Sequence, residues 1–155
     1  MRYLLFDRIV AVERGRRMEA TKLVSLADAY LADHYPRRPV MPGSLIVEGL
    51  AQLGGMLNLV NHAFAVEMVL ALIGGVRFAG DARPGDLIVL EVHMLYDHPY
   101  GATMRGEARI GAASVAEVER MVYVYDKATD DRVIRTNRER FAYAGGSPDG
   151  QGEPA

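Results

Sequence analysis

A histidine and a glutamate on either side of a stiff loop are the residues best placed to do chemistry. His34 begins a loop with proline at positions 36, 39 and 42. Each proline fixes its own φ and favours extended geometry in the residue before it. Glu48 is the only charged residue in the apolar stretch from Leu45 to Val66. Because a carboxylic acid that an apolar environment keeps protonated suits a general acid, the pair is a candidate for acid and base catalysis.

The loop ends at a sequence, Pro42-Gly43-Ser44, that predicts the start of a helix. Gly43 tolerates any φ, Ser44 can cap the helix, and Glu48 falls in the first turns, where the helix dipole favours an anion. The N–H of Gly43 would then be available to an oxygen that gains negative charge. A structural alternative, in which Glu48 caps its own helix or meets an arginine, is slightly favoured by composition alone. A structural role is also our expectation for His62, His93 and His98.

The stretch from Leu45 to Val66 predicts a helix buried inside the protein, because it is hydrophobic on all sides. Its length approaches the ~20 apolar residues of a membrane span. We reject a span because the flanks lack a basic anchor and polar residues recur along the stretch. These residues are Gln52, Asn58, Asn61 and His62. The adjacent Gly54 and Gly55 indicate close approach of a strand or of a second copy of the helix.

The segments around this helix alternate in polarity with the two-residue period of β-strands. A hairpin is predicted from residues 3–12 and 18–24, with a turn around Gly15, and a helical turn follows within 25–35. After the helix, strands are expected at 69–78, 87–97, 104–112 and 115–125. Strands segregated from one long helix predict an α+β fold in which the sheet wraps the helix.

The alternation also predicts which strand residues face the core. The apolar sets are Ile88, Leu90, Val92, Met94 and Tyr96, then Met104, Gly106, Ala108 and Ile110, then Ala116, Val118, Val122 and Val124. Beyond Asp126 the pattern fades, and residues 129–141 read as a solvated segment of uncertain structure. We therefore expect one domain at residues 1–143 and a flexible C-terminal tail at residues 144–155.

The composition is that of an ordinary globular protein and argues against several functions. Of 155 residues, 50% are hydrophobic and 25% charged, with a net charge of −2, so nothing suggests nucleic acid or a membrane surface as partner. With no cysteine, disulfides, thiolate metal sites and a cysteine nucleophile are excluded. The first residues hold too short an apolar stretch for a signal peptide, and we expect a cytoplasmic protein.

The stretch HYPRRPVMPGSLIVEGLAQLGG resembles the active-site signature of the FabA/FabZ-type 3-hydroxyacyl-ACP dehydratases, and is closer to the FabZ type. That signature runs histidine, an aromatic residue, Pro-Gly-Arg-Pro, a hydrophobic pair, Pro-Gly, and a helix carrying an acid and a glutamine. The resemblance extends to LLFDRIVAVERGRRMEATKLVS and FAGDARPGDLIVLEV, and so covers residues 3–125. It implies a hotdog fold, in which a curved antiparallel β-sheet wraps a long central helix, paired as a homodimer. A trimer of dimers also occurs among relatives.

Carried over position by position, the resemblance implies roles for four residues. His34 stands at the catalytic histidine and Glu48 at the catalytic acid, which this family takes from opposite subunits. Gly43 stands at the oxyanion glycine, and Gln52, one helical turn after Glu48, at the glutamine that orients the acid. The family uses no metal and no organic cofactor. Its reaction converts a (3R)-3-hydroxyacyl thioester to the trans-2-enoyl thioester in fatty-acid or related acyl-chain biosynthesis, and a glutamate favours dehydration without isomerisation.

An acyl tunnel and a surface for the acidic acyl carrier protein follow from the same reading. The tunnel candidates are Leu45, Leu53, Met56 and Leu57, for which a core role is the simpler alternative. The candidates for carrier-protein contact are Arg16, Arg17, Arg37 and Arg38. A surface arginine is usually just solvated, which is the alternative for all four.

Three departures from the family pattern leave chain length and pathway open: Arg37 replaces a glycine, Gly49 replaces an alanine, and an arginine-rich extension follows Asp126. Two other functions also stay open. One is a hotdog acyl thioesterase, in which the helix carboxylate directs water at the thioester, and His34 argues against it. The other is a non-catalytic acyl-binding subunit derived from a dehydratase, against which the intact set of His34, Glu48 and Gln52 argues.

Overall fold

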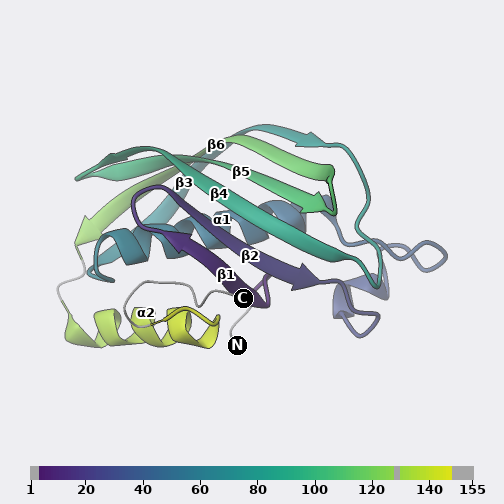
Figure 1. Ribbon diagram of the computed structural model, residues 1–155, viewed down its shortest axis with the longest axis horizontal. Helices are drawn as coiled ribbons and strands as arrows, with labels where there is room; N and C mark the ends of the chain where they lie inside the picture. The colour runs from purple at the N-terminus through teal and green to yellow at the C-terminus, as the bar shows by residue number, and fades with distance from the viewer. Residues whose placement is uncertain (1–3, 128–129, 148–155) are drawn as a thin grey trace.

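The protein is a curved antiparallel sheet wrapped around one long helix, with a second helix outside the wrap (Figure 1). The computed structural model describes residues 4–127 and 130–147. The long helix is α1 (Gly43–Asn61) and the second is α2 (Asp131–Tyr143). A short 3₁₀ turn, η1 (Ala29–Leu31), leads into the loop before α1 and confirms the helical turn predicted there. The arrangement confirms the predicted α+β class.

The sheet has six strands in the order β1-β2-β4-β5-β6-β3, and every neighbouring pair is antiparallel. Their bounds are β1 Arg8–Glu13, β2 Arg17–Leu23, β3 Val66–Phe78, β4 Leu87–His98, β5 Gly101–Ile110 and β6 Ala113–Lys127. The predicted hairpin is confirmed as β1–β2, but its first strand starts at Arg8 rather than at residue 3. Leu5 and Phe6 lie before the first strand and are buried, with 3% and 2% of their surface exposed.

The core lies between α1 and the concave face of the sheet. Leu50, Leu53 and Leu57 of α1 are 0% exposed. By length and composition α1 could cross a membrane, yet 61% of its apolar window is buried inside this fold, as expected for a core helix. The prediction that the helix reaches Val66 was wrong. Ala63 and Phe64 adopt φ of 53° and 66°, which ends the helix and turns the chain into β3.

The start of α1 also differs from the prediction. Pro42 is the N-cap residue and Gly43 the first helical residue, so Ser44 lies inside the helix and does not cap it. A proline just before the first turn suits a helix start, because its fixed φ is already close to helical. A Cβ on Gly43 would lie 2.6 Å from Cε1 of Phe78, so any larger residue there would require this partly exposed ring to move.

Two irregularities change which strand residues face the core. Ile88, Leu90 and Val92 are buried as predicted, but the pairing of β4 with β5 shifts register after Met94, and Tyr96 is 61% exposed. A second shift lies in β6, where Met104 pairs with Met121 but Gly106 pairs with Val118. A bulge reverses the alternation that follows it. The buried residues of β6 beyond the bulge are therefore Met121 and Tyr123 rather than the predicted Val122 and Val124.

The segment predicted to be of uncertain structure forms helix α2. Asp130 caps it by accepting a 2.8 Å hydrogen bond from the N–H of Arg132. Phe141 is 1% exposed and fixes the helix against the fold. The predicted tail is also partly ordered, because the N–H of Ile9 donates to the carbonyl of Ala144 at 2.8 Å. The remainder of that tail, residues 148–155, lies outside the described residues.

The two adjacent glycines of α1 lead to a prediction about stability. A Cβ on Gly54 would press on the hydroxyl of Tyr123 and lie 3.1 Å from Sδ of Met104, whereas a Cβ on Gly55 would meet its nearest atom, Sδ of Met68, at 3.8 Å. We expect Gly54→Ala to lower the free energy of unfolding by about 1–3 kcal/mol through overpacking. The matched Gly55→Ala should be neutral or stabilising by up to ~1 kcal/mol. Equal unfolding curves for the two variants would contradict this packing.

Candidate active site

The loop that carries His34 is closed by backbone hydrogen bonds. The N–H of Val40 donates to the carbonyl of His34 at 3.1 Å, and Tyr35 and Arg38 exchange backbone bonds of 3.3 and 2.9 Å inside that loop. The N–H of Met41 then donates to Ala82 at 2.8 Å, which ties the end of the loop to the segment before β4. The prolines and these bonds together hold His34 in a defined position ahead of α1.

The hydrogen bonding of His34 identifies the nitrogen that can act as a base. Nδ1 of His34 lies 3.0 Å from the carbonyl oxygen of Val40. A carbonyl can only accept a hydrogen bond, so Nδ1 must carry the proton. The neutral ring then keeps a lone pair on Nε2, which is free to accept a proton. The ring of Tyr35 stacks on the imidazole with centroids 4.3 Å apart and supports its orientation.

Glu48 is held by Gln52, as the family resemblance implies. The N–H of Leu5 donates to Oε1 of Gln52 at 2.9 Å, and Nε2 of Gln52 donates to Oε1 of Glu48 at 2.9 Å. The first bond settles the orientation of the amide, because a backbone N–H needs an acceptor. The amino group of Gln52 must therefore face Glu48. A backbone group at the start of the chain thus orients an acid in the second turn of α1.

The environment of Glu48 differs from the sequence-based expectation. Glu48 is exposed in this chain, so the desolvation that we expected to keep its carboxyl group protonated is not provided by the chain itself. Its close neighbour is Tyr123, whose hydroxyl donates to the carbonyl of Ala51 at 2.7 Å. Burial, and to a smaller extent the charge of Glu48, raises the pKa of the Tyr123 hydroxyl. Tyr123 therefore stays a neutral donor beside the carboxylate.

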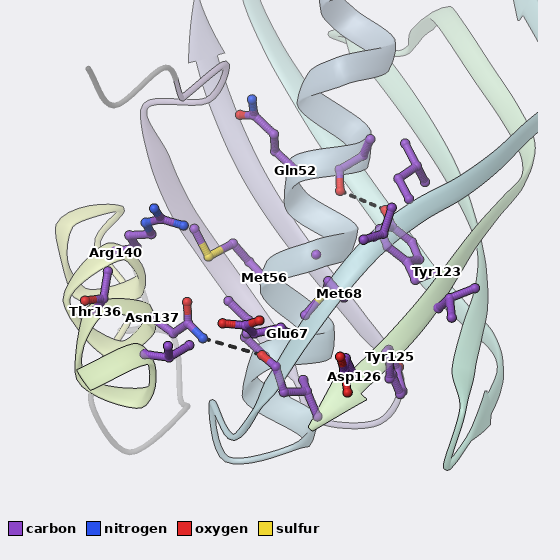
Figure 2. Close-up of a pocket in the computed structure, with 18 of the residues that line it drawn as sticks. Gln52, Met56, Glu67, Met68, Tyr123, Tyr125, Asp126, Thr136, Asn137 and Arg140 are labelled. Atoms are coloured by element: carbon purple, nitrogen blue, oxygen red, sulfur yellow. Dashed lines mark hydrogen bonds between the residues drawn. The ribbon is translucent and has the colours of Figure 1, made fainter. Parts of the chain in front are cut away.

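A cavity of about 1270 Å³ opens beside Glu48, between α1, β3, the end of β6 and α2 (Figure 2). Glu48, Gln52 and Met56 line it from α1. His34 and Gly43 are absent from its lining, so the chain brings the acid and its orienting glutamine together but does not add the histidine to the same cavity. Within the described residues, no group of three or more His, Cys, Asp or Glu side chains could hold a metal ion.

The four tunnel candidates divide between the cavity and the core. Met56 lines the cavity, whereas Leu53 and Leu57 are wholly buried in the core between α1 and the sheet. Leu45 is half-buried and packs against that core. Contact of any of the four with an acyl chain stays a prediction, and Met56 is the one that the cavity favours.

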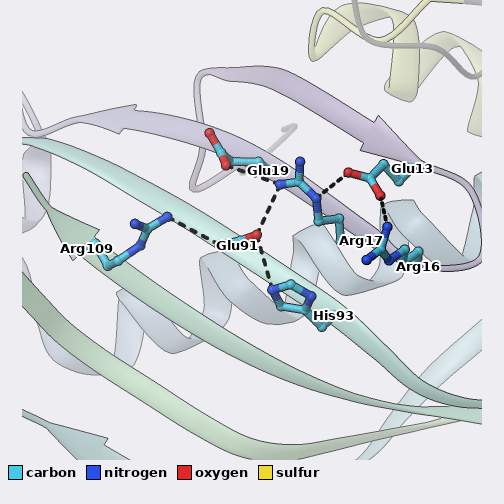
Figure 3. A network of polar contacts seen from close by, with 7 residues as sticks. All are labelled: Glu13, Arg16, Arg17, Glu19, Glu91, His93 and Arg109. Carbon is cyan, nitrogen blue, oxygen red and sulfur yellow. Dashed lines mark hydrogen bonds and ion pairs between the residues drawn. The ribbon is translucent and has the colours of Figure 1, made fainter. Parts of the chain in front are cut away.

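The four arginines proposed for carrier-protein contact have different surroundings. Arg17 is paired with Glu13 at 2.5 Å and Glu91 at 3.1 Å, in a network on the outer face of the sheet (Figure 3). Arg16 also pairs with Glu13, at 3.1 Å. Arg38 pairs with Asp81. Arg37, by contrast, is exposed and forms no ion pair with any residue that the structure describes, so its charge is the most available of the four.

The other histidines take part in surface contacts. Nε2 of His93 lies 3.2 Å from Glu91 in the network of Figure 3, and Nε2 of His62 lies 3.3 Å from Asp97. The ring of His98 lies tilted against that of Tyr100, with centroids 5.3 Å apart. None of these three histidines lines the cavity beside Glu48.

Sequence reasoning missed two contributors to this site. Leu5 acts through its backbone N–H, which no residue type could have revealed. The polar wall of the cavity comes from α2, through Thr136 and Arg140 among others. Val133, Thr136 and Arg140 recur at the three- and four-residue spacing of one helix face. That signal was present in the sequence but was masked by the high charge of the segment.

Comparison with known proteins agrees with this geometry. A family model described as a FabA-like domain matches residues 1–119. The 3-hydroxyacyl-[acyl-carrier-protein] dehydratase FabZ of Paracidovorax citrulli is 38% identical over 125 residues, which cover 77% of this chain and 84% of that protein.

Two solved structures share the fold at low sequence identity. The protein smu.793 of Streptococcus mutans, bound to acetyl CoA, matches with a TM-score of 0.66 at 15% identity, over 84% of this chain and 96% of that one. The dehydratase heterocomplex ApeI:P of Xenorhabdus doucetiae matches with a TM-score of 0.64 at 15% identity, over 86% of this chain and 88% of that one. The wrapped helix thus defines a hotdog-fold protein. More particularly, the chain belongs to the FabA-like family, among the FabZ-type 3-hydroxyacyl-[acyl-carrier-protein] dehydratases.

The geometry at His34 predicts its tautomer. Because Nδ1 faces the carbonyl of Val40, the neutral ring should carry its proton on Nδ1 and none on Nε2. Nitrogen-15 chemical shifts of the histidine ring, measured above the pH at which it titrates, distinguish the two nitrogens. A signal from Nε2–H at His34 would contradict the proposed base, and His62, with Nε2 beside Asp97, provides an internal comparison.

Proposed function

We propose that the protein dehydrates (3R)-3-hydroxyacyl thioesters carried on acyl carrier protein to trans-2-enoyl thioesters, in fatty-acid or related acyl-chain biosynthesis. The observation that carries this proposal is the chain of hydrogen bonds from Leu5 through Gln52 to Glu48. A glutamate held in this way, on the helix that begins at Gly43, matches the acid that the family signature requires. We expect the enzyme to need no metal and no cofactor and to work in the cytoplasm.

The proposed reaction uses three groups. Nε2 of His34 removes a proton from the carbon next to the thioester carbonyl, and the electron pair moves onto the carbonyl oxygen. The N–H of Gly43, at the positive end of α1, stabilises that oxygen as it gains charge. The carboxylic acid of Glu48 then donates its proton to the 3-hydroxyl group, the C–O bond breaks, and water leaves as the double bond forms.

The complete site is proposed to form between two copies of the chain. β3 is an edge strand of 13 residues whose free side has no partner among the described strands. Val69 and Phe78 on it are 70% and 55% exposed. A long apolar edge strand invites pairing with another strand. A partner docked there would cover the cavity beside Glu48, supply the desolvation that the single chain lacks, and bring a second His34 toward it.

The variant Glu48→Gln tests the acid. We expect it to abolish turnover, because an amide cannot donate the required proton, while the dimer measured by size exclusion stays intact. The assay follows the mass of the acyl group on a short 3-hydroxyacyl carrier protein by mass spectrometry. Loss of one water, reversed from the enoyl side, is the expected result for the wild type.

Combining Glu48→Gln with a second inactive variant tests whether the site is shared between subunits. His34→Ala and Glu48→Gln should each be inactive alone. A dimer with one chain of each variant would keep both native groups in about half of its sites. Activity that returns on co-expression supports a site shared between subunits. If the mixture stays as inactive as its components, the two groups do not meet across a dimer.

The same mass-spectrometric assay separates the rival functions. A thioesterase would release the free carrier thiol and the hydroxy acid. A non-catalytic acyl-binding subunit would bind the acyl carrier protein and leave its mass unchanged at every chain length. Either result in the wild type would remove the dehydratase proposal.

Carrier-protein binding is proposed to involve Arg37 more than the other three arginines. Arg37→Glu should weaken binding of the acidic carrier protein about tenfold or less, and the effect should shrink as salt is added, because it is a surface charge contact. Arg16→Glu is the matched control, since Arg16 is already paired with Glu13. Equal affinities for wild type and Arg37→Glu, measured by calorimetry at low salt, would remove Arg37 from the carrier surface.

A further inference from the structure

Helix α2 lies outside the residues that the family model matches. The family model matches residues 1–119, and α2 begins only at Asp131. The helix nevertheless faces the cavity that contains Glu48 and Gln52. Its lining residues are Asp130, Arg132, Val133, Thr136, Asn137 and Arg140. A helix that supplies one wall of the cavity beside the candidate acid is placed to affect what that cavity accepts.

Specific contacts hold α2 in place and make it a fixed wall. Asn137, which is 8% exposed, donates from Nδ2 to the carbonyls of Phe64 and Val66, at 3.3 and 3.5 Å. These carbonyls lie in the connection between α1 and β3. The ring of Phe141 packs on that of Phe64 with centroids 5.5 Å apart. Beyond the helix, Ala144 accepts the 2.8 Å bond from Ile9. The middle and the C-terminal end of α2 are therefore tied to the hotdog core.

The wall facing α2 is largely apolar, although Glu67 of β3 and Asp126 of β6 also line the cavity. Met56 and Leu59 of α1, with Met68 and Leu70 of β3, line the cavity beyond Glu48 and Gln52. Figure 2 shows Met56 extending from α1 toward α2, and Arg140 extending from α2 toward Met56. On the α2 side, Val133 is the apolar member of a lining that otherwise consists of polar and charged side chains.

The size of the cavity indicates what could occupy it. Its volume is about 1270 Å³, somewhat above the range of roughly 300–1,000 Å³ that is usual for small-molecule sites. A short hydroxyacyl group would fill only the part near Glu48. A long chain would continue between Met56 and Met68 on one side and α2 on the other.

We infer that α2 forms the far wall of the acyl-binding cavity and determines how long an acyl chain that cavity accepts. This inference rests on the proposed dehydratase function. Thr136, which lies midway along the cavity-facing side of α2, is the specificity-determining residue that we select for a test. It acts on the distal part of the acyl chain, at a distance from the groups that carry out the reaction.

The test compares Thr136→Trp with wild type on 3-hydroxybutyryl, 3-hydroxyoctanoyl and 3-hydroxydodecanoyl carrier protein. The indole would fill the cavity from the α2 side, so the loss of kcat/KM should grow with chain length. We expect the ratio of the dodecanoyl to the butyryl value to fall at least about tenfold, since each lost methylene contact is worth that order of discrimination. Arg135→Trp, at an exposed position outside the cavity lining, is the matched control and should leave the ratio unchanged.

A second variant and a second readout keep the result decisive. If Thr136→Trp does not fold, Arg140→Trp places the same indole at an exposed position of the same wall. An unchanged chain-length ratio in a folded wall variant would overturn the inference. If the wild type dehydrates none of the substrates, the proposed function fails. The role of α2 as a wall of the cavity is then tested by calorimetry, which measures the binding of dodecanoyl and butyryl pantetheine thioesters. Weaker binding of the dodecanoyl thioester alone in Thr136→Trp would support the wall, and equal binding in both proteins would remove it.

Discussion

Burial of α1 inside the sheet is the constraint on which the rest of this structure depends. Leu50, Leu53 and Leu57 are fully buried against the concave face, so the helix can neither rotate nor slide without exposing them. The position of this helix determines where its first residue, Gly43, lies and in which direction Glu48 projects. It also determines that Gln52 faces Leu5. Burying a leucine side chain is worth about 1.5–3 kcal/mol, and several such side chains together outweigh the few hydrogen bonds at the site, each worth about 0.5–3 kcal/mol. Packing therefore sets the geometry, and the polar contacts refine it.

The geometry of the site depends on two stiff segments, which are the loop before α1 and α1 itself. The loop before α1 is stiffened by prolines and closed by the bonds between His34 and Val40. Those bonds also choose the tautomer of His34. Gln52 has the corresponding role for Glu48, because its own amide is oriented from Leu5. In each case a backbone group fixes a side chain, so the chemistry depends on the fold more than on additional polar residues.

Much of this arrangement could be predicted from the sequence, and the failures have physical causes. The apolar run of α1, the β1–β2 hairpin and the i, i+4 pair of Glu48 and Gln52 are local patterns, and all three are found in the structure. The prediction that Val122 and Val124 face the core was wrong because of a bulge in β6. That bulge arises from the pairing of β6 with β5, and the local sequence carries no signal for it. The charge of residues 129–141 concealed α2, whose burial of Phe141 depends on a surface supplied by Phe64.

The exposure of Glu48 could not have been anticipated from an apolar helix alone. Hydrophobic residues surround it in sequence, but the sheet covers only one side of α1, and Glu48 projects from the other. The desolvation expected for a proton donor must then come from whatever covers the cavity. The sequence patterns describe one chain, and they carry no direct information about a covering partner.

The contact between Phe78 and Gly43 joins two positions that are far apart in the chain. Phe78 ends the edge strand β3, and its ring occupies the space that a side chain at position 43 would need. The two positions therefore form a size-matched pair, in which a residue larger than glycine at 43 needs the aromatic ring at 78 to move away or to be replaced by something smaller. Among related sequences, the volumes at these two sites should consequently be inversely correlated.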